Sequence, residues 1–334
     1  MTKSSQKGPH FSTDEFGLIA EYFAPLAKSP GALGLLDDGA ILQLEPDQEL
    51  VMTADMIVSG VHFLPSAQAE EIAIRLLAVN VSDLAAMGAA PIGYLLSVAL
   101  TDEQDGNWLA RFSKRLERDQ QNYDMVLLGG DTVSTPGPLT LNVTAFGSVP
   151  KGQALQRSHA QPGDAIYVSG TIGDSALGLM ALQNQLPDIG EGISTALIER
   201  FQNPQPRVAL GQSLRGIAGG VADISDGLLA DLGHICKASN TGATLFAGEI
   251  PLSAAARTVL EKAPNLIDSV LSGGDDYELI FTISGESQHQ FDQLQNTSAL
   301  PLTQIGEISA GSTVEVRAEN GENIDVKSRG YSHF

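Results

Sequence analysis

Apolar residues recur at helical spacing in several stretches of the chain. The stripe within residues 16–23 follows Ser12 and Glu15, whose spacing is that of a capping box, so we expect a helix that begins after Ser12. The same periodicity predicts further helices over residues 70–87, 108–122, 176–183, 205–215 and 225–237.

Short apolar runs bounded by turn residues predict the strands. These runs cover residues 40–44, 50–53, 93–100, 125–128, 139–148, 165–169 and 277–283, and residues 306–326 alternate in the manner of edge strands. Residues 187–195 are expected to form a loop. Because strands and helices interleave in both halves, the pattern predicts an α/β or α+β fold.

Turn-forming residues mark a change near the middle of the chain, at residues 150–152 and again at 161–164. A chain of 334 residues is long enough for two domains of ordinary size. We therefore expect two domains, one over residues 1–150 and one over residues 151–334.

The charge of the chain restricts its partners. Its formal net charge is −21, which argues against nucleic acid or an anionic membrane surface as a partner because no basic stripe is available to neutralise phosphates. An anionic ligand would be repelled unless divalent cations lay between it and the protein.

Two further features bear on location. Cys236 is the only cysteine, so it cannot form an intrachain disulfide, and such sparse use of cysteine is typical of a reducing cytoplasm. Residues 1–16 lack the apolar centre of a signal peptide, and the hydrophobic region 72–100 contains charged residues. We therefore expect a cytoplasmic protein without a membrane partner.

Aspartates recur among glycines and small polar residues in seven clusters, none of which contains lysine. The clusters are Asp37-Asp38-Gly39, Thr53-Ala54-Asp55, Asn80-Val81-Ser82-Asp83, Gly129-Gly130-Asp131-Thr132, Gly173-Asp174-Ser175, Asp223-Ile224-Ser225-Asp226-Gly227 and Gly273-Gly274-Asp275-Asp276. Carboxylates are hard oxygen ligands that suit Mg²⁺. If several clusters converge, they can bind a highly anionic ligand such as a nucleoside triphosphate through metal ions.

Each cluster also has a structural explanation when taken alone. Asp38 before Gly39 is a common turn pair, and Asp226 can cap the predicted helix that follows it. Asn80 and Asp83 share one face of a predicted helix, which can be either a ligand site or a domain seam.

Other candidates are equally open at this point. His62 is either structural or a ligand contact, and Arg157 is either a solvated side chain or a phosphate clamp. No P-loop motif occurs, and residues 170–173 lack the third glycine of a dinucleotide fingerprint, although that strand-to-helix turn could meet phosphate.

Taken in order, the clusters closely resemble the motifs of the thiamine-monophosphate kinase family, within the superfamily of aminoimidazole ribonucleotide synthetase. The resemblance extends from about residue 15 to residue 334. Besides the clusters it rests on Gly60-Val61-His62-Phe63, on Tyr277-Glu278 and on the terminal Gly330-Tyr331-Ser332-His333-Phe334.

This resemblance implies the fold and the activity. The fold would have an N-terminal α/β domain that pairs with a second copy into a dimer barrel and binds ATP and magnesium. The C-terminal α/β domain would complete the phosphate and substrate site. The activity would be transfer of the γ-phosphoryl group of ATP to thiamine monophosphate, with several Mg²⁺ ions, in a homodimer.

The resemblance also implies roles for individual residues. Metal-ligand positions are matched by Asp38, Thr53, Ala54, Asp55, Asp83, Asp131, Asp223 and Asp226. ATP contacts are matched by Gly130, Asp131, Arg157 and Ser225, and substrate contacts by His62, Asp275 and Tyr331. None of them is expected to act as a covalent nucleophile or general base.

Two positions depart from the family pattern. Ala54 stands where threonine is common, so a metal contact there could use only the main-chain carbonyl. Asp275 stands where glutamate is common, which shortens the side chain by one methylene group.

Two other functions fit the same residues. The chain could be another ATP-dependent member of the superfamily that acts on an amide or formyl substrate and releases ADP and phosphate. It could also be a non-catalytic regulator that binds magnesium or nucleotide. Incubation with thiamine phosphate and ATP discriminates between the three.

Overall fold

The computed structural model describes residues 14–318, 320–326 and 330–331. It divides into two compact units, one formed by Met1–Leu84 with Ala90–Lys151 and the other by Ala85–Ala89 with Gly152–Phe334. Each unit has its own sheet and is described by itself.

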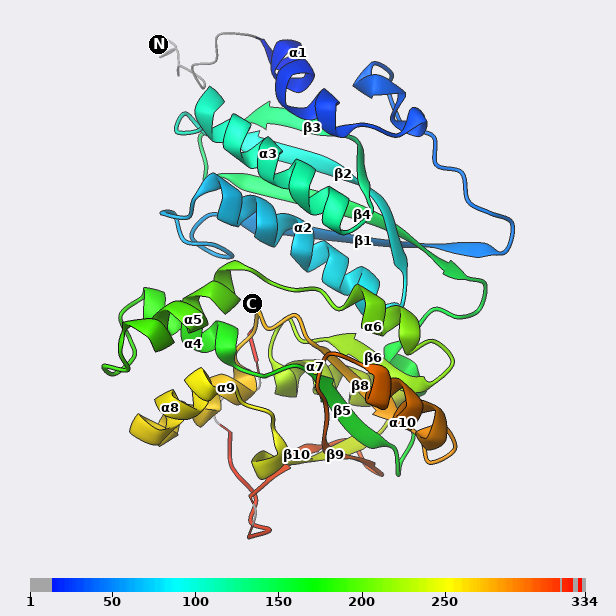
Figure 1. The fold of residues 1–334 in the computed structure, drawn as a ribbon, viewed down its shortest axis with the longest axis vertical. Coiled ribbons are helices and arrows are strands. Elements are labelled where there is room, and N and C mark those ends of the chain that lie inside the picture. Colours follow the sequence, from blue (N-terminus) through cyan, green and yellow to red (C-terminus); the bar gives the residue numbers. More distant parts are fainter. Residues whose placement is uncertain (1–13, 319, 327–329, 332–334) are drawn as a thin grey trace, which may run out of the picture. The chain divides into compact units, whose positions relative to one another are not determined.

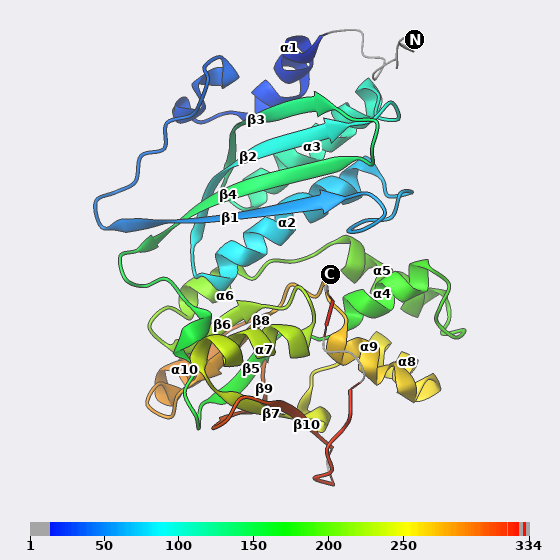
Figure 2. The ribbon, with the colours of Figure 1, turned by 180° about the vertical axis from the view of Figure 1, so that it is seen from behind.

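The first unit contains a four-stranded sheet in the order β1-β4-β2-β3. The strands are β1 (Gln48–Val58), β2 (Ala90–Leu100), β3 (Val126–Ser134) and β4 (Thr140–Pro150). All neighbours are antiparallel except the parallel pair β2 and β3. Helices α2 (Ala69–Ala86) and α3 (Gly106–Asn122) cover one face, as Figure 1 shows, and the opposite face of the sheet is turned to the viewer in Figure 2.

The alternation of side chains along the strands explains this arrangement. Every second residue of β4, from Leu141 to Val149, is buried, and the residues between them are half-buried. Since successive side chains of a strand point to opposite faces, one face of the sheet packs against the helices and the other is partly open.

The N-terminal segment differs from the sequence-based expectation. Its helix α1 (Glu15–Leu18) is capped by Asp14, whose Oδ1 accepts from the N–H of Gly17 at 2.9 Å, and it continues as a π-helical turn, η1 (Ile19–Phe23). Ser12, the expected cap, lies outside the described residues. Phe16 is 77% exposed rather than part of a buried stripe.

Short helical turns and a loop complete this segment. The turns are η2 (Ala24–Leu26) and η3 (Pro30–Leu35). The expected strand over residues 40–44 is wrong, because these residues form no ladder with a neighbouring strand and run as a loop toward β1.

The second unit contains a six-stranded sheet in the order β10-β7-β9-β5-β8-β6. The strands are β5 (Ala165–Ser169), β6 (Ala218–Asp223), β7 (Gly242–Phe246), β8 (Leu279–Ile283), β9 (Leu302–Ser309) and β10 (Val314–Arg317). The helices are α4 (Asp174–Leu182), α5 (Glu191–Gln202), α6 (Val208–Ser213), α7 (Leu228–Ser239), α8 (Ala254–Lys262), α9 (Ile267–Ser272) and α10 (Gln288–Thr297). Single 3₁₀ turns occur at η4 (Arg157–His159), η5 (Ala247–Glu249) and η6 (Pro264–Leu266).

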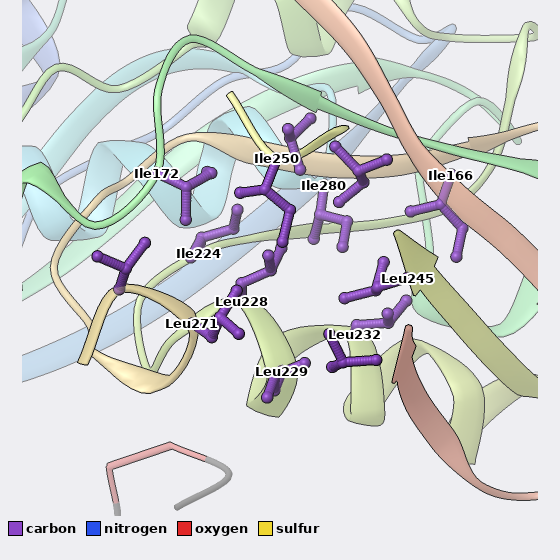
Figure 3. Close-up of a cluster of buried hydrophobic side chains, with 14 of the residues drawn as sticks. Ile166, Ile172, Ile224, Leu228, Leu229, Leu232, Leu245, Ile250, Leu271 and Ile280 are labelled. Carbon is purple, nitrogen blue, oxygen red and sulfur yellow. The ribbon is translucent and has the colours of Figure 1, made fainter. Parts of the chain in front are cut away.

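Two hydrophobic clusters cover the two faces of this sheet. Leu228 and Leu232 of α7 lie against Leu245 and Ile280 of the strands in the larger cluster (Figure 3). On the opposite face, the ring of Phe291 from α10 lies 4.5 Å from that of Tyr167 and 5.7 Å from that of Phe281. Strands β5 and β8 contribute alternate residues to both clusters, which fixes their register.

Several expectations for this unit need correction. Residues 187–195 are not all loop, because α5 begins at Glu191. Of the two strands that overlap residues 306–326, only β10 lies at an edge, while β9 pairs with β5 and β7. Among the helices of the described residues, none is long and apolar enough to cross a membrane.

Candidate functional site

In the first unit, polar side chains meet where β1 crosses α2. The hydroxyl of Thr53 donates to the carboxylate of Asp83, and the N–H of Asp55 donates to Oδ1 of Asn80 at 3.0 Å. Thr53 and Asp55 are two apart on one strand, and Asn80 and Asp83 are three apart on one helix, so each pair shares a face. The structure therefore brings together Thr53, Asp55 and Asp83, three of the metal ligands expected from the sequence.

Asn80 is structural rather than a ligand. Its side chain is fully buried, and while Oδ1 accepts from Asp55, its Nδ2 donates to the carbonyl of Leu76 at 3.0 Å. The carbonyl of Asp55 in turn accepts from Nδ2 of Asn142 at 3.1 Å. Both backbone groups of Asp55 are thus fixed by asparagine side chains, which holds this part of β1 in place.

The second group of candidates lies on β3. Residues 129–131 were expected at the end of a strand, but they lie inside β3, where Asp131 pairs with Ser97 of β2. A Cβ at Gly130 would overlap the carbonyl of Leu96, so only glycine fits at this close approach. Asp131 is exposed, and its Oδ1 accepts from the N–H of Thr132 at 2.9 Å.

Asp131 lines a pocket of about 740 Å³ in the first unit. One part of its wall is polar and includes Asp37, Asp38 and Gly130. The rest is largely apolar and comes from the N-terminal segment and from the sheet, with contributions from Phe16, Ile19, Phe23, Leu35, Leu42, Leu50, Leu95 and Phe146. A pocket with an apolar wall and an acidic rim can hold a flat ring together with a cation-bound anionic group.

The two groups lie on the two edge strands of the sheet. Asp55 belongs to β1 and Asp131 to β3, and β4 and β2 lie between them. Three strand spacings amount to roughly 14 Å. Within one copy of the first unit these residues therefore form two separate groups rather than one ligand set.

His62 lies in the turn that follows β1. Its Nδ1 accepts from the N–H of Val58 at 3.1 Å, so Nε2 carries the proton when the ring is neutral. Gly60, with φ of 81°, provides the left-handed residue that this turn requires.

In the second unit, backbone hydrogen bonds join the loop of Ser225 and Asp226 to two other segments of the chain. The N–H of Asp275 donates to the carbonyl of Ser225 at 2.9 Å, and the N–H of Tyr331 donates to that of Asp226 at 3.0 Å. A Cβ at Gly274 would overlap the carbonyl of Ser225. The structure thus brings together Ser225, Asp226, Asp275 and Tyr331, while His333 and Phe334 of the same motif lie outside the described residues.

Asp231, which the sequence analysis missed, organises one of these loops. Its Oδ2 accepts from the N–H groups of Ser225, Asp226 and Gly227 at 3.1, 3.1 and 3.2 Å. Asp226 was considered as a cap of the following helix, but the cap position of α7 is Gly227 and the carboxylate of Asp231 satisfies the free amides instead.

The environment of Asp231 is strongly acidic. Burial is the main cause that raises its pKa well above the usual range, and the charges of Asp223 and Asp226 add to this rise. The N–H of Asp226 and the charge of Arg157, an exposed residue of η4, act in the opposite direction. This crowding of carboxylates favours a cation at the end of β6.

Asp226, Asp231 and His234 offer ligand atoms that all lie within 4.8 Å of one another. The spacing of Asp231 and His234 places them on one face of α7, and this i, i+3 pattern after the Asp223–Gly227 loop is the signal by which the sequence could have identified them.

Two carboxylates of the 273–278 segment have structural partners. Asp276 accepts from the N–H groups of Gly173 at 2.7 Å and Ser175 at 3.3 Å, and its complete burial raises its pKa to about 8. These amides are therefore not the phosphate contact that the turn at residues 170–173 suggested. Glu278 forms ion pairs with Arg200 at 3.2 Å and with Arg207.

Asp174 also has a structural role. Its two oxygens accept from the hydroxyl groups of Thr171 at 2.6 Å and Ser253 at 2.5 Å. Because hydroxyl donors hold both oxygens of this buried side chain, the cluster at residues 173–175 stabilises the start of α4.

Comparison with known proteins places these features in a family. Residues 36–149 match the family "AIR synthase related protein, N-terminal domain", and residues 161–319 match "AIR synthase related protein, C-terminal domain". The thiamine-monophosphate kinase of Escherichia coli (strain K12) is 42% identical over 322 residues, which cover 96% of this chain and 98% of that protein.

Solved structures agree with the sequence comparison. The crystal structure of thiamine-monophosphate kinase from Stenotrophomonas maltophilia K279a superposes with a TM-score of 0.82 at 42% identity, covering 95% of this chain and 100% of that one. AaThiL complexed with AMPPCP and TMP has a TM-score of 0.76 at 31% identity, covering 96% and 97%. The chain therefore belongs to the thiamine-monophosphate kinase family of the AIR synthase-related proteins.

Proposed function

We propose that this chain transfers the γ-phosphoryl group of ATP to thiamine monophosphate and so forms thiamine diphosphate. The observation that carries the proposal is the identity of 42% over 96% of the chain with a thiamine-monophosphate kinase. A relative at 31% identity, AaThiL, is solved with an ATP analogue and TMP. Both ligands are anionic, and the many carboxylates of this chain would repel them. The carboxylates can take part in binding only if cations accompany the ligands.

Mg²⁺ is the cation that the donor set fits. The candidate ligands are carboxylate, hydroxyl and carbonyl oxygens, the donors that magnesium prefers. In the proposal they are Asp38, Thr53, Ala54, Asp55, Asp83, Asp131, Asp223 and Asp226. When bound, magnesium supplies charge neutralisation and alignment of the two phosphates.

The nucleotide contacts in the proposal are Gly130, Asp131, Arg157 and Ser225. The pocket beside Asp131 has the volume and the apolar wall that an adenine ring requires. Gly130 lines the same pocket as Asp131, which supports a main-chain contact to the nucleotide at this position. Arg157 supplies a permanent positive charge for a phosphate oxygen.

The substrate contacts in the proposal are His62, Asp275 and Tyr331. Thiamine phosphate carries a cationic thiazolium ring and an aminopyrimidine, so a carboxylate such as that of Asp275 suits its positive charge and its amino donor. The hydrogen bond between the N–H of Tyr331 and the carbonyl of Asp226 supports a shared location with the Ser225 loop.

The chemical step is a direct in-line transfer. A phosphate oxygen of thiamine phosphate attacks the γ-phosphorus, the bond from this phosphorus to the β,γ-bridging oxygen breaks, and ADP leaves. Because the second pKa of a phosphate monoester is about 6, this oxygen is already ionised at neutral pH, and no general base is required. Inversion at a chiral γ-phosphorus is expected, and retention would indicate a phosphoenzyme.

A homodimer and a cytoplasmic location belong to the proposal as well. Met52 and Met56 on the open face of β1 are 63% and 54% exposed, which suits contact with a second copy. The buried lone Cys236 is consistent with a reducing compartment.

Incubation of the full chain with thiamine phosphate, ATP and Mg²⁺ tests the activity. Thiamine diphosphate, detected as fluorescent thiochrome diphosphate, is the expected product. Release of ADP and phosphate with an amide or formyl acceptor instead would favour another superfamily activity. Nucleotide binding without any turnover would favour a regulator.

A further inference from the structure

We propose that Tyr277 is a positioning residue, which holds the carboxylate of Asp275 in the orientation that a cationic, heteroaromatic substrate requires. The inference rests on the proposed function and deepens it, because it assigns a role in the affinity for thiamine phosphate to a residue that the resemblance leaves without one.

The backbone of this segment is strained. Asp275 has φ of 73° and Tyr277 has φ of 51°, which are left-handed conformations that are energetically unfavourable for residues other than glycine. The strain is maintained by neighbours, since the N–H groups of Asp275 and Tyr277 donate to the carbonyls of Ser225 and Ile224 at 2.9 and 2.8 Å. Strain that is over-determined in this way is typical of segments with a functional role.

A buried residue anchors the segment between its two strained positions. The carboxylate of Asp276 accepts from the amides of Gly173 and Ser175, and its own carbonyl accepts from Arg200 at 3.3 Å. Asp276 is fully buried. The backbone on either side of it therefore has little freedom to move.

The side chains of the two strained residues meet. The hydroxyl of Tyr277 donates to Oδ1 of Asp275 at 2.9 Å. Tyr277 is 7% exposed, whereas Asp275 is half-buried, so the tyrosine lies in the interior and the carboxylate lies where a ligand can reach it. A carboxylate has about four acceptor positions, so it can accept from this hydroxyl and from substrate donors at once.

This geometry fits the shorter side chain at position 275. A carboxylate whose rotamer is fixed before binding loses less conformational entropy when the substrate arrives. The hydroxyl of Tyr277 supplies that fixation, and its removal is expected to weaken binding of the thiamine moiety without altering the phosphates.

The test is the variant Tyr277→Phe in the full chain, which keeps the ring and removes only the hydroxyl. We expect the KM for thiamine phosphate to rise roughly tenfold, as for loss of a hydrogen bond to a charged group. We expect the KM for ATP and kcat to change less than about twofold and the melting temperature to stay within a few degrees, because the packing is retained. A merely structural role would change all four.

Two further variants keep the test decisive. Tyr167→Phe is the matched control, because Tyr167 is another buried tyrosine of this unit whose hydroxyl lies 3.5 Å from Oε1 of Gln304. Its KM for thiamine phosphate should not change. In an Asp275→Ala background, Tyr277→Phe should have no additional effect on this KM.

The outcomes separate the two proposals. An active parent chain whose KM for thiamine phosphate is unchanged by Tyr277→Phe would overturn the positioning role alone, as would full additivity in the double variant. If Tyr277→Phe does not fold, Tyr277→His decides, since histidine tolerates positive φ and also removes the phenol hydroxyl, and an unchanged KM for thiamine phosphate in that variant would overturn the positioning role. A parent chain that does not phosphorylate thiamine phosphate contradicts the proposed function and this inference together.

Discussion

Carboxylates of similar sequence context differ in what faces them in the folded chain. Asp174 and Asp276 accept from hydroxyl and amide donors, and Glu278 is paired with two arginines. Asp223 and Asp226, in contrast, lie close enough to Asp231 to raise its pKa. The sequence could not separate these classes, because donors such as Ser253 come from elements far along the chain. The first class is structural, and the second suits cation binding.

The carboxylates at the crossing of β1 and α2 are expected to be essential for turnover. Asp55→Asn or Asp83→Asn removes a charged candidate ligand while it keeps the shape of the side chain. Turnover should fall on the order of a hundredfold or more, because phosphate charge is no longer neutralised at this point. Steady-state rates and the thermal unfolding profile of each variant provide the measurement.

Asp102→Asn is the control for these variants, since Asp102 is exposed in a turn of the same unit. It should have the rate of the parent chain. Near-normal rates of Asp55→Asn and Asp83→Asn at low Mg²⁺ would remove both residues from the site.

The buried Asp276 predicts a dependence of stability on pH. Burial raises its folded pKa from 3.8 to about 8, so between these values the folded state keeps a proton that the unfolded state releases. The contribution of this group to stability is therefore largest at low pH and is lost as the pH rises toward 8. In Asp276→Asn the side chain cannot ionise, and this loss should disappear.

Thermal unfolding between pH 6 and 9 measures the effect. The melting temperature of the parent chain should decline relative to that of Asp276→Asn as the pH rises. Parallel profiles for the two proteins would show that Asp276 does not carry a raised pKa.

At the scale of elements, periodicity predicted the long helices and the central strands well. The helix expected over residues 70–87 is observed at Ala69–Ala86, and the strand expected over 93–100 is observed at Ala90–Leu100. Expectations failed where tertiary contacts decide. Within the run at 40–44, Ala40 and Leu42 line a pocket, and the run does not pair in a sheet.

The glycines of residues 129–130 show the same limit. They suggested the end of a strand, yet β3 continues through them to Ser134 because its neighbour β2 supplies partners as far as Leu100. Turn propensity cannot report such pairing, since glycine is also selected where two strands approach closely.

This close approach predicts the effect of a methyl group. Gly130→Ala should destabilise the first unit by about 1–3 kcal/mol, because its Cβ overlaps the carbonyl of Leu96 and β2 and β3 must move apart. Denaturant unfolding gives this value, and the KM for ATP should rise in parallel. Gly39→Ala, where nothing lies within 4 Å of the added Cβ, should leave stability unchanged. Equal stability of both variants would contradict the packing argument.

At the scale of the whole molecule, the net charge of −21 and the open face of the first sheet call for partners of two kinds. Cations are required before an anionic substrate can bind, and a second copy is a suitable cover for the methionines of β1. The sequence indicated the first requirement through its composition. It could indicate the second copy only through the family resemblance. The reason is that a strand face that contacts a second copy shows the same alternation of residues as a strand face that contacts solvent.

The proposed dimer predicts the effect of a charge on this face. Met52→Glu should convert a dimer, at twice the 35.1 kDa of one chain, into a monomer, because a carboxylate would be buried between two apolar faces. Light scattering measures the mass in solution. Leu36→Glu is the control, since Leu36 is 91% exposed and lies outside the sheet. A dimer that survives Met52→Glu would place the interface elsewhere.

The proposed phosphoryl transfer to thiamine phosphate can be tested in a single incubation of the chain with thiamine phosphate, ATP and Mg²⁺, in which thiamine diphosphate, ADP and free phosphate are quantified together. We expect one thiamine diphosphate for each ADP and no free phosphate above the background. Formation of ADP and phosphate without thiamine diphosphate, or no ADP at all, would contradict it.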